Sequence, residues 1–133
     1  MHTIEKRPSG YVLTFQGVVT PSEMHEWATQ SKAILSLNIG NFGVIVDFRR
    51  LVRLQPEADT ILSSVRALYR TKGMQRTAIV LANTILTTRF RRLAEQAGTH
   101  EWERYINVTT MDNWSEAAVR WVRDGTEPPF DFH

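Results

Sequence analysis

The hydrophobic and polar positions of this chain follow two periods. Around residues 8–10 (Pro-Ser-Gly), which have turn chemistry, apolar and polar side chains alternate with the period of two that is typical of half-buried strands. The run at 44–48 is apolar until Asp47, which indicates a central strand covered on both faces. Two later apolar runs are of the same kind. The predicted strands are 3–6, 11–18, 44–48, 77–82 and 105–109.

Between these strands, apolar residues recur at helical spacing. Thr20 precedes Pro21 and lies three residues before Glu23, which is the pattern of a capping box at a helix start. Pro56 marks the start of a second helix, and Gly98 follows the end of a third. A fourth helix ends before Gly125. In the third helix the predicted buried stripe comprises Ile85, Leu86, Arg89, Phe90, Leu93 and Ala97.

The predicted order ββαβαβαβα defines an α/β fold with one mixed sheet. An N-terminal antiparallel hairpin is followed by parallel strands with right-handed crossovers, and the helices pack on the sheet. The chain of 133 residues is long enough to bury one core. We expect a single domain over residues 1–125 and a C-terminal tail at 126–133, which lies outside the pattern.

Composition excludes several classes of chemistry. The chain has no cysteine, so it has no disulfide framework, thiolate zinc site or thiol nucleophile. Its four histidines lack metal-ligand spacing, and it contains no phosphate loop or nucleophile elbow. We therefore predict no metal, no cofactor and no enzymatic activity. No apolar run approaches the roughly 18 residues of a membrane span, and the first residues show no secretory signal, which favours a cytoplasmic protein.

Charge is distributed unevenly along the chain. The net charge of +2 is too small to indicate nucleic acid binding, but residues 44–92 carry ten basic and three acidic residues, whereas residues 93–133 carry three basic and eight acidic ones. Thirteen of the sixteen basic residues are arginine, which suits bidentate anion contacts. Either these charges are spread over an ordinary solvated surface, or a basic face meets an anionic partner. That partner includes the acidic end of another copy in a homodimer.

Two groups of residues are candidates for binding. Asp47 ends a buried strand, at the sheet edge where open α/β folds bind ligands, and Arg49, Arg50 and Arg53 follow in a predicted loop. An ion pair of Asp47 with one of these arginines is the alternative. The second group, on the third helix, is a candidate anion site: Arg89, Arg91 and Arg92. If the two groups converge, they suit phosphate or a phospholipid headgroup; if the helix projects them outward, they are a solvated face.

The order and spacing of these segments resemble the STAS domain of sulfate transporters and anti-sigma factor antagonists. More closely, the chain is similar to bacterial SpoIIAA-like proteins, which share a core with the Sec14/CRAL-TRIO lipid-binding fold. The resemblance covers residues 3–124. It is carried by Gly17 and by the segments 44–48, 78–81, 105–108 and 116–122.

The resemblance implies a non-enzymatic regulatory module that binds a protein partner. In anti-sigma factor antagonists, a serine at the start of the helix after the third strand is phosphorylated. The corresponding stretch here, Gln55-Pro56-Glu57, has no hydroxyl, so we expect no phosphorylation switch there. Glu57 is either a fixed negative charge or an ordinary first-turn acid. The predicted partner- or ligand-binding residues are Asp47, Arg49, Arg50, Arg53, Gln55 and Glu57.

The kinship with the Sec14-like fold implies an alternative function. The chain is then a binding protein for a lipid or another small apolar or anionic ligand. This alternative requires an internal cavity between helices and sheet, with arginines at its mouth.

Overall fold

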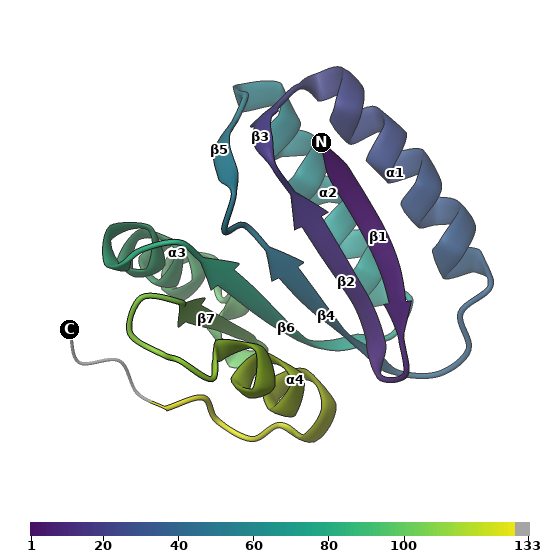
Figure 1. Cartoon of the computed structure of the whole chain (residues 1–133). Helices are drawn as coiled ribbons and strands as arrows, with labels where there is room; N and C mark the ends of the chain where they lie inside the picture. The colour runs from purple at the N-terminus through teal and green to yellow at the C-terminus, as the bar shows by residue number, and fades with distance from the viewer. Residues whose placement is uncertain (130–133) are drawn as a thin grey trace.

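The computed structural model describes residues 1–129. A five-stranded sheet is covered by α1, α2 and α3 on one face and by α4 on the other (Figure 1). The strands are β1 (His2–Arg7), β2 (Gly10–Phe15), β3 (Gly17–Val19), β4 (Phe42–Asp47), β5 (Leu51–Leu54), β6 (Met74–Leu81) and β7 (Glu103–Asn107). The helices are α1 (Pro21–Ser36), α2 (Pro56–Thr71), α3 (Thr84–Ala97), the 3-10 turn η1 (Thr99–Glu101) and α4 (Trp114–Asp124).

The main sheet has the strand order β1-β2-β4-β6-β7. β1 and β2 form an antiparallel hairpin, and each following neighbour is parallel to the one before. The predicted α/β class, the mixed sheet and the helices packed on it are therefore confirmed.

Two short strands, β3 and β5, were not predicted. The expected strand at 11–18 ends at Phe15, because the chain turns at Gly17 (φ +71°) and leaves the main sheet. The expected loop after Asp47 contains β5, which pairs in parallel with β3 through Gly17 opposite Leu51 and Val19 opposite Leu54. A strand of four residues has too little hydrophobic pattern to be recognised by itself, and only its distant partner stabilises it.

The core has two parts because the sheet is covered on both faces. On the side of α1 to α3, the aromatic rings of Phe15, Trp27 and Tyr69 lie together, with Trp27 and Tyr69 stacked at 5.9 Å between centroids. On the other side, Trp121 of α4 packs in a second cluster that includes Ile106 of β7. Burial on both faces explains why the run at 44–48 shows no alternation.

The predicted buried stripe of α3 is partly wrong. Thr87 and Ala94 are buried, and Leu86 and Phe90 pack against the core. The remaining predicted members, Ile85, Arg89, Leu93 and Ala97, are exposed. Apolar residues occur on two overlapping helical faces here, and packing against the sheet selects one of them.

Candidate functional site

The starts of α1 and α2 lie side by side. β3 leads directly into Pro21, and β5 leads directly into Pro56, so the parallel pairing of these strands brings both helix starts together. The backbone N–H of Gln55 donates to the carbonyl of Val19 at 3.1 Å, which joins the two junctions. Thr20 caps α1 by accepting a hydrogen bond from the Glu23 N–H at 3.2 Å, whereas the side chain of Gln55 makes no capping bond to α2.

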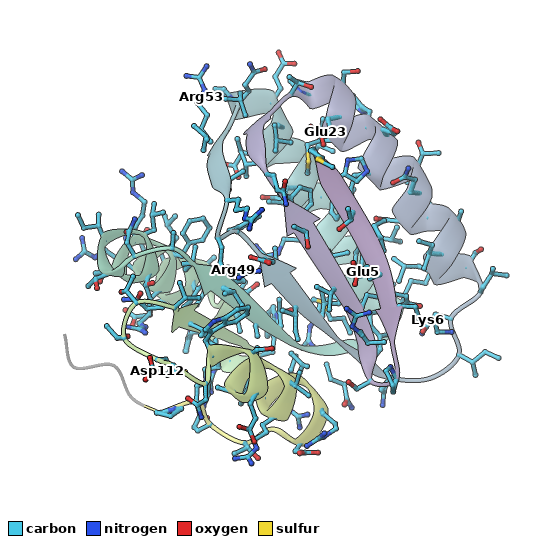
Figure 2. All side chains as sticks on the ribbon, in the orientation of Figure 1. Glu5, Lys6, Glu23, Arg49, Arg53 and Asp112 are labelled. Carbon is cyan, nitrogen blue, oxygen red and sulfur yellow. The ribbon has the colours of Figure 1, made fainter. Side chains whose placement is uncertain are left out.

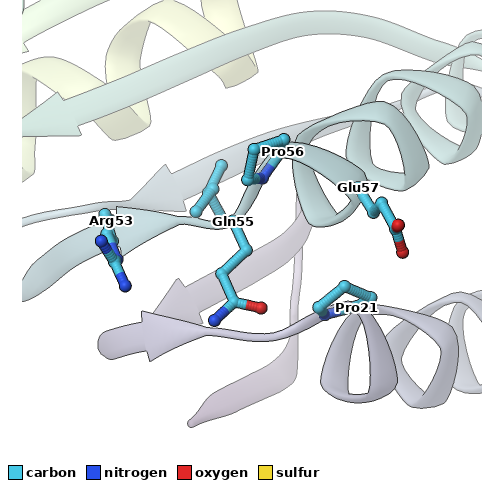
Figure 3. Close-up of a pocket in the computed structure, with 6 residues that line it drawn as sticks. Pro21, Arg53, Gln55, Pro56 and Glu57 are labelled. Atoms are coloured by element: carbon cyan, nitrogen blue, oxygen red, sulfur yellow. The ribbon is translucent and has the colours of Figure 1, made fainter.

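A surface hollow of about 440 Å³ lies between these helix starts. It is lined by Pro21, Arg53, Leu54, Gln55, Pro56 and Glu57. Figure 3 shows the Gln55 side chain extending from the start of α2 toward the chain that enters α1, with Arg53 on the same side. We call this group the helix-start surface. It presents a guanidinium, an amide and a carboxylate within one small area.

The charges around the helix-start surface are mixed. Helix starts carry partial positive charge, and α2 offsets its own with Glu57 and Asp59 in its first turn. On α1, Glu23 is held by the amino group of Met1 and by His2. Partial burial acts to raise the pKa of Glu23, but hydrogen bonds from these two groups outweigh it and lower the pKa. A mixture of charges suits a polar protein surface better than it suits one strongly charged ligand.

Asp47 and Arg49 bind each other. The Arg49 Nη2 lies 2.8 Å from Asp47 Oδ2, and the Arg49 backbone N–H donates to Asp47 Oδ1 at 3.0 Å. The same guanidinium lies 4.3 Å from the ring centroid of Trp114 at the start of α4. The hydrogen bond with Asp47 raises the pKa of Arg49. This cluster therefore joins the exit of β4 to α4.

The structure divides the predicted site residues. Arg53, Gln55 and Glu57 line the helix-start surface, whereas Asp47 and Arg49 pair outside it. Arg50 is exposed in the turn before β5, where its carbonyl accepts a hydrogen bond from the Gly17 N–H at 2.9 Å. These residues do not form one group.

The predicted arginines of α3 are divided as well. Arg89 and Arg92 line a second hollow, which shares no lining residue with the first. Arg91 is half-buried and interacts electrostatically with Tyr105. The convergence of the two arginine groups, which a shared anion site requires, is not found among these lining residues.

A buried polar cluster between α2 and β7 was missed by sequence reasoning. Glu103 forms an ion pair with Arg66, and it also accepts hydrogen bonds from the Tyr105 hydroxyl and from Thr99 Oγ1. Burial lowers the pKa of Arg66 and raises that of Tyr105. Glu103 and Tyr105 share one face of β7, and this spacing of two was the available signal. Only the fold shows that Arg66 reaches them.

Metal and membrane sites were also considered. Within residues 1–129, histidines and carboxylates do not gather in a group of three able to hold a metal ion. None of the helices in that range combines the length and the hydropathy that crossing a bilayer requires.

Similarity to solved structures places the chain among proteins with a SpoIIAA-like fold. An uncharacterised protein of the DUF3478 family from Shewanella loihica PV-4, described as having this fold, superimposes with a TM-score of 0.68 at 13% identity over 92% of each chain. The phosphorylated form of the Bacillus cell fate determinant SpoIIAA gives a TM-score of 0.59 at 13% identity, over 80% of this chain and 92% of that one.

The unphosphorylated anti-sigma factor antagonist SpoIIAA gives a TM-score of 0.51 at 18% identity, over 68% of this chain and 82% of that one. No protein-family model matches the chain, and no curated protein matches it. At these identities the likeness establishes the fold, and the predicted SpoIIAA-like resemblance is confirmed at that level.

Proposed function

We propose that this protein is a non-enzymatic, STAS-like regulatory module of the cytoplasm, which binds a protein partner through the helix-start surface. The observation that carries the proposal is the parallel pairing of β3 with β5. It brings two helix starts together around the side chains of Arg53, Gln55 and Glu57. A rigid scaffold that presents polar side chains at junctions between strands and helices is typical of recognition surfaces.

The likeness to SpoIIAA supports a regulatory role. One of the similar structures is described as an anti-sigma factor antagonist, and another shows SpoIIAA in a phosphorylated form. In this chain the stretch Gln55-Pro56-Glu57 offers no hydroxyl at the start of α2. Glu57 places a permanent carboxylate in the first turn instead. We infer that partner binding here is controlled by something other than phosphorylation of this turn.

The Sec14-like alternative is a protein that carries a lipid or another small ligand. It requires an internal cavity between the helices and the sheet. The rings of Phe15, Trp27 and Tyr69 occupy that region. No observation on the described residues favours this alternative.

Site-specific photo-crosslinking tests the proposal. A photoreactive amino acid replaces Gln55 in the helix-start surface, or Thr3 on the exposed edge strand β1 as the control. Each variant is exposed to an extract of the source cells. We expect a protein adduct from position 55 that is absent from position 3. Arg53→Glu should reduce the yield of this adduct about tenfold, because it reverses a charge in the contact.

Native mass spectrometry of the purified protein completes the test. A retained small molecule that is lost on organic extraction, together with no adduct at position 55, contradicts the proposal and supports the small-ligand alternative. Equal adducts at both positions, or an adduct unaffected by Arg53→Glu, contradict the assignment of the partner to the helix-start surface.

A further inference from the structure

The outer side of α3 forms a second surface, separate from the helix-start surface. A hollow of about 450 Å³ lies along this helix. α3 covers the part of the sheet farthest from β1 (Figure 1), and many of its side chains extend into solvent (Figure 2). We call this surface the α3 face. It consists of Ile85, Thr88, Arg89, Arg92, Leu93 and Gln96.

The α3 face exposes large apolar side chains. Ile85 is 81% exposed and Leu93 is 53% exposed. These residues are eight positions apart, which separates them by about 12 Å along a helix. Both lie beside the hollow together with Arg89 and Arg92. Apolar side chains gathered at a hollow and rimmed by polar groups mark an interaction surface.

The arginines of the α3 face lack counterions. Among residues 1–129, no carboxylate lies within ion-pair distance of Arg89 or Arg92. The one acidic residue in α3 is Glu95. The surface therefore carries a net positive charge that its own neighbours do not neutralise, and charge complementarity calls for a partner with carboxylates.

A second copy of this chain fits the α3 face poorly. In a symmetric pair, the same face meets itself, so Arg89 and Arg92 would lie against their own copies. In a head-to-tail contact, the acidic C-terminal part would have to supply free carboxylates. Several acids there already bind arginines of the same part: Arg104 with Glu127, Arg120 with Glu116, and Arg123 with Asp124.

Membranes and nucleic acids also fit less well. Lipid surfaces with anionic headgroups are recognised by clusters of about 4–8 basic residues, whereas the α3 face has Arg89 and Arg92 alone. Single-stranded nucleic acid is bound on aromatic platforms, and none of the lining residues is aromatic. The combination of two arginines with two separated apolar side chains suits a protein segment.

We propose that the α3 face docks an acidic amphipathic helix of a partner protein. Two apolar side chains of that helix, about two turns apart, pack on Ile85 and Leu93. Carboxylates between them bind Arg89 and Arg92. This is the helix-in-groove mode of recognition, in which regularly spaced apolar anchors provide affinity and flanking charges provide specificity. The proposal is independent of the helix-start surface, which shares no residue with it.

The absence of cysteine allows a direct test. Gln96→Cys provides a single thiol on the α3 face for an environment-sensitive dye. This protein is titrated with a synthetic helical peptide that carries two leucines seven positions apart and glutamates between them. The matched peptide has lysine in place of glutamate. We expect the acidic peptide to change the emission of the dye and to bind more weakly as salt increases, and we expect no response to the basic peptide.

Charge reversal assigns the contact. Arg89→Glu combined with Arg92→Glu should weaken binding of the acidic peptide at least about tenfold. Both residues are exposed, so thermal melting should be unchanged. Arg53→Glu, in the helix-start surface, and Lys6→Glu, on β1, should leave peptide binding unchanged. Loss of binding with Arg53→Glu but not with the α3 variant would overturn this proposal and leave the proposed function intact.

Other results also overturn the proposal. These are no binding of the acidic peptide at millimolar concentration, equal binding of both peptides, or binding that survives charge reversal on α3. A dye response to phosphatidylglycerol vesicles or duplex DNA, but not to the acidic peptide, would assign the α3 face to a lipid surface or a nucleic acid instead.

Discussion

Arg66 on α2 forms an ion pair with Glu103 on β7, and the side chain of Glu103 is 1% exposed. Removing one partner of a buried pair leaves the other charge desolvated, which costs about 3–5 kcal/mol. Arg66 is itself 32% exposed, so water can enter beside Glu103 after its removal. We therefore expect Arg66→Ala to lower the free energy of unfolding by about 3 kcal/mol in urea denaturation.

A double-mutant cycle separates this pair from general packing. Glu103→Gln alone should also destabilise the fold, and Arg66→Ala combined with Glu103→Gln should cost less than the sum of the single changes. Strict additivity would show that the two side chains do not interact in solution.

Tyr69 makes stability dependent on alkaline pH. It is buried, and its hydroxyl lies 2.7 Å from Ser31 Oγ. Burial raises the pKa of Tyr69 to about 12. An unfolded tyrosine ionises near pH 10, whereas the folded one stays neutral up to about pH 12. The contribution of Tyr69 to stability is therefore complete below pH 10 and is lost between pH 10 and 12, by about 1.4 kcal/mol per pH unit.

The variant Tyr69→Phe measures this contribution. It should be slightly less stable at neutral pH, because Ser31 loses its partner, and its free energy of unfolding should fall less steeply between pH 10 and 12. Equal slopes for the two proteins over that range would rule out Tyr69 as the titrating group.

The start of α2 lacks a side-chain cap. Gln55 occupies the N-cap position with extended backbone (φ −66°, ψ 153°), but its side chain does not bond to the first turn. Serine at this position accepts a hydrogen bond from that turn. We expect Gln55→Ser to raise the free energy of unfolding by about 0.5–1 kcal/mol, measured by chemical denaturation. Thr20→Ala, at the capped start of α1, should lower it by about 1 kcal/mol.

Gly43 allows β4 and α4 to approach closely. A Cβ atom at this position would lie 2.6 Å from Val122 Cβ and 2.8 Å from the Val122 carbonyl oxygen. Because backbone atoms cannot rotate away, Gly43→Ala should destabilise the protein by about 2–3 kcal/mol. Gly40→Ala is the control: it meets no atom within 4 Å, so only the positive φ of +83° opposes it, at about 1 kcal/mol. Thermal melting that ranks Gly40→Ala below Gly43→Ala contradicts this explanation.

The C-terminal tail at 126–133 is predicted to be dispensable for folding. Its described part binds the domain through the ion pair of Glu127 with Arg104, and Glu127 is 65% exposed. Such surface pairs contribute at most about 1 kcal/mol. Truncation after Gly125 should therefore leave the fold intact and shift the melting temperature by a few degrees. A large loss of stability would show that the tail packs on the domain. Positions 130–133, including the predicted docking of Phe130 and Phe132, lie outside the described residues.

Most of the site depends on contacts between distant segments. The predicted candidates Arg53, Gln55 and Glu57 lie together, but Pro21 joins them from another helix only because β3 pairs with β5. Asp47 and Arg49 turn away from this group to bind each other. Sequence separation alone does not predict which of several neighbouring arginines a carboxylate will bind.

The sequence by itself determined the elements whose signals are local. Thr20, Pro21 and Pro56 mark helix starts through capping and backbone restriction, and the apolar run at 44–48 predicts a central strand because it has no polar face. Tertiary structure alone decided the pairing of β3 with β5, the ion pair of Arg66 with Glu103, and the face of α3 that is buried. These outcomes depend on which surfaces the fold brings together, and a local pattern allows more than one of them.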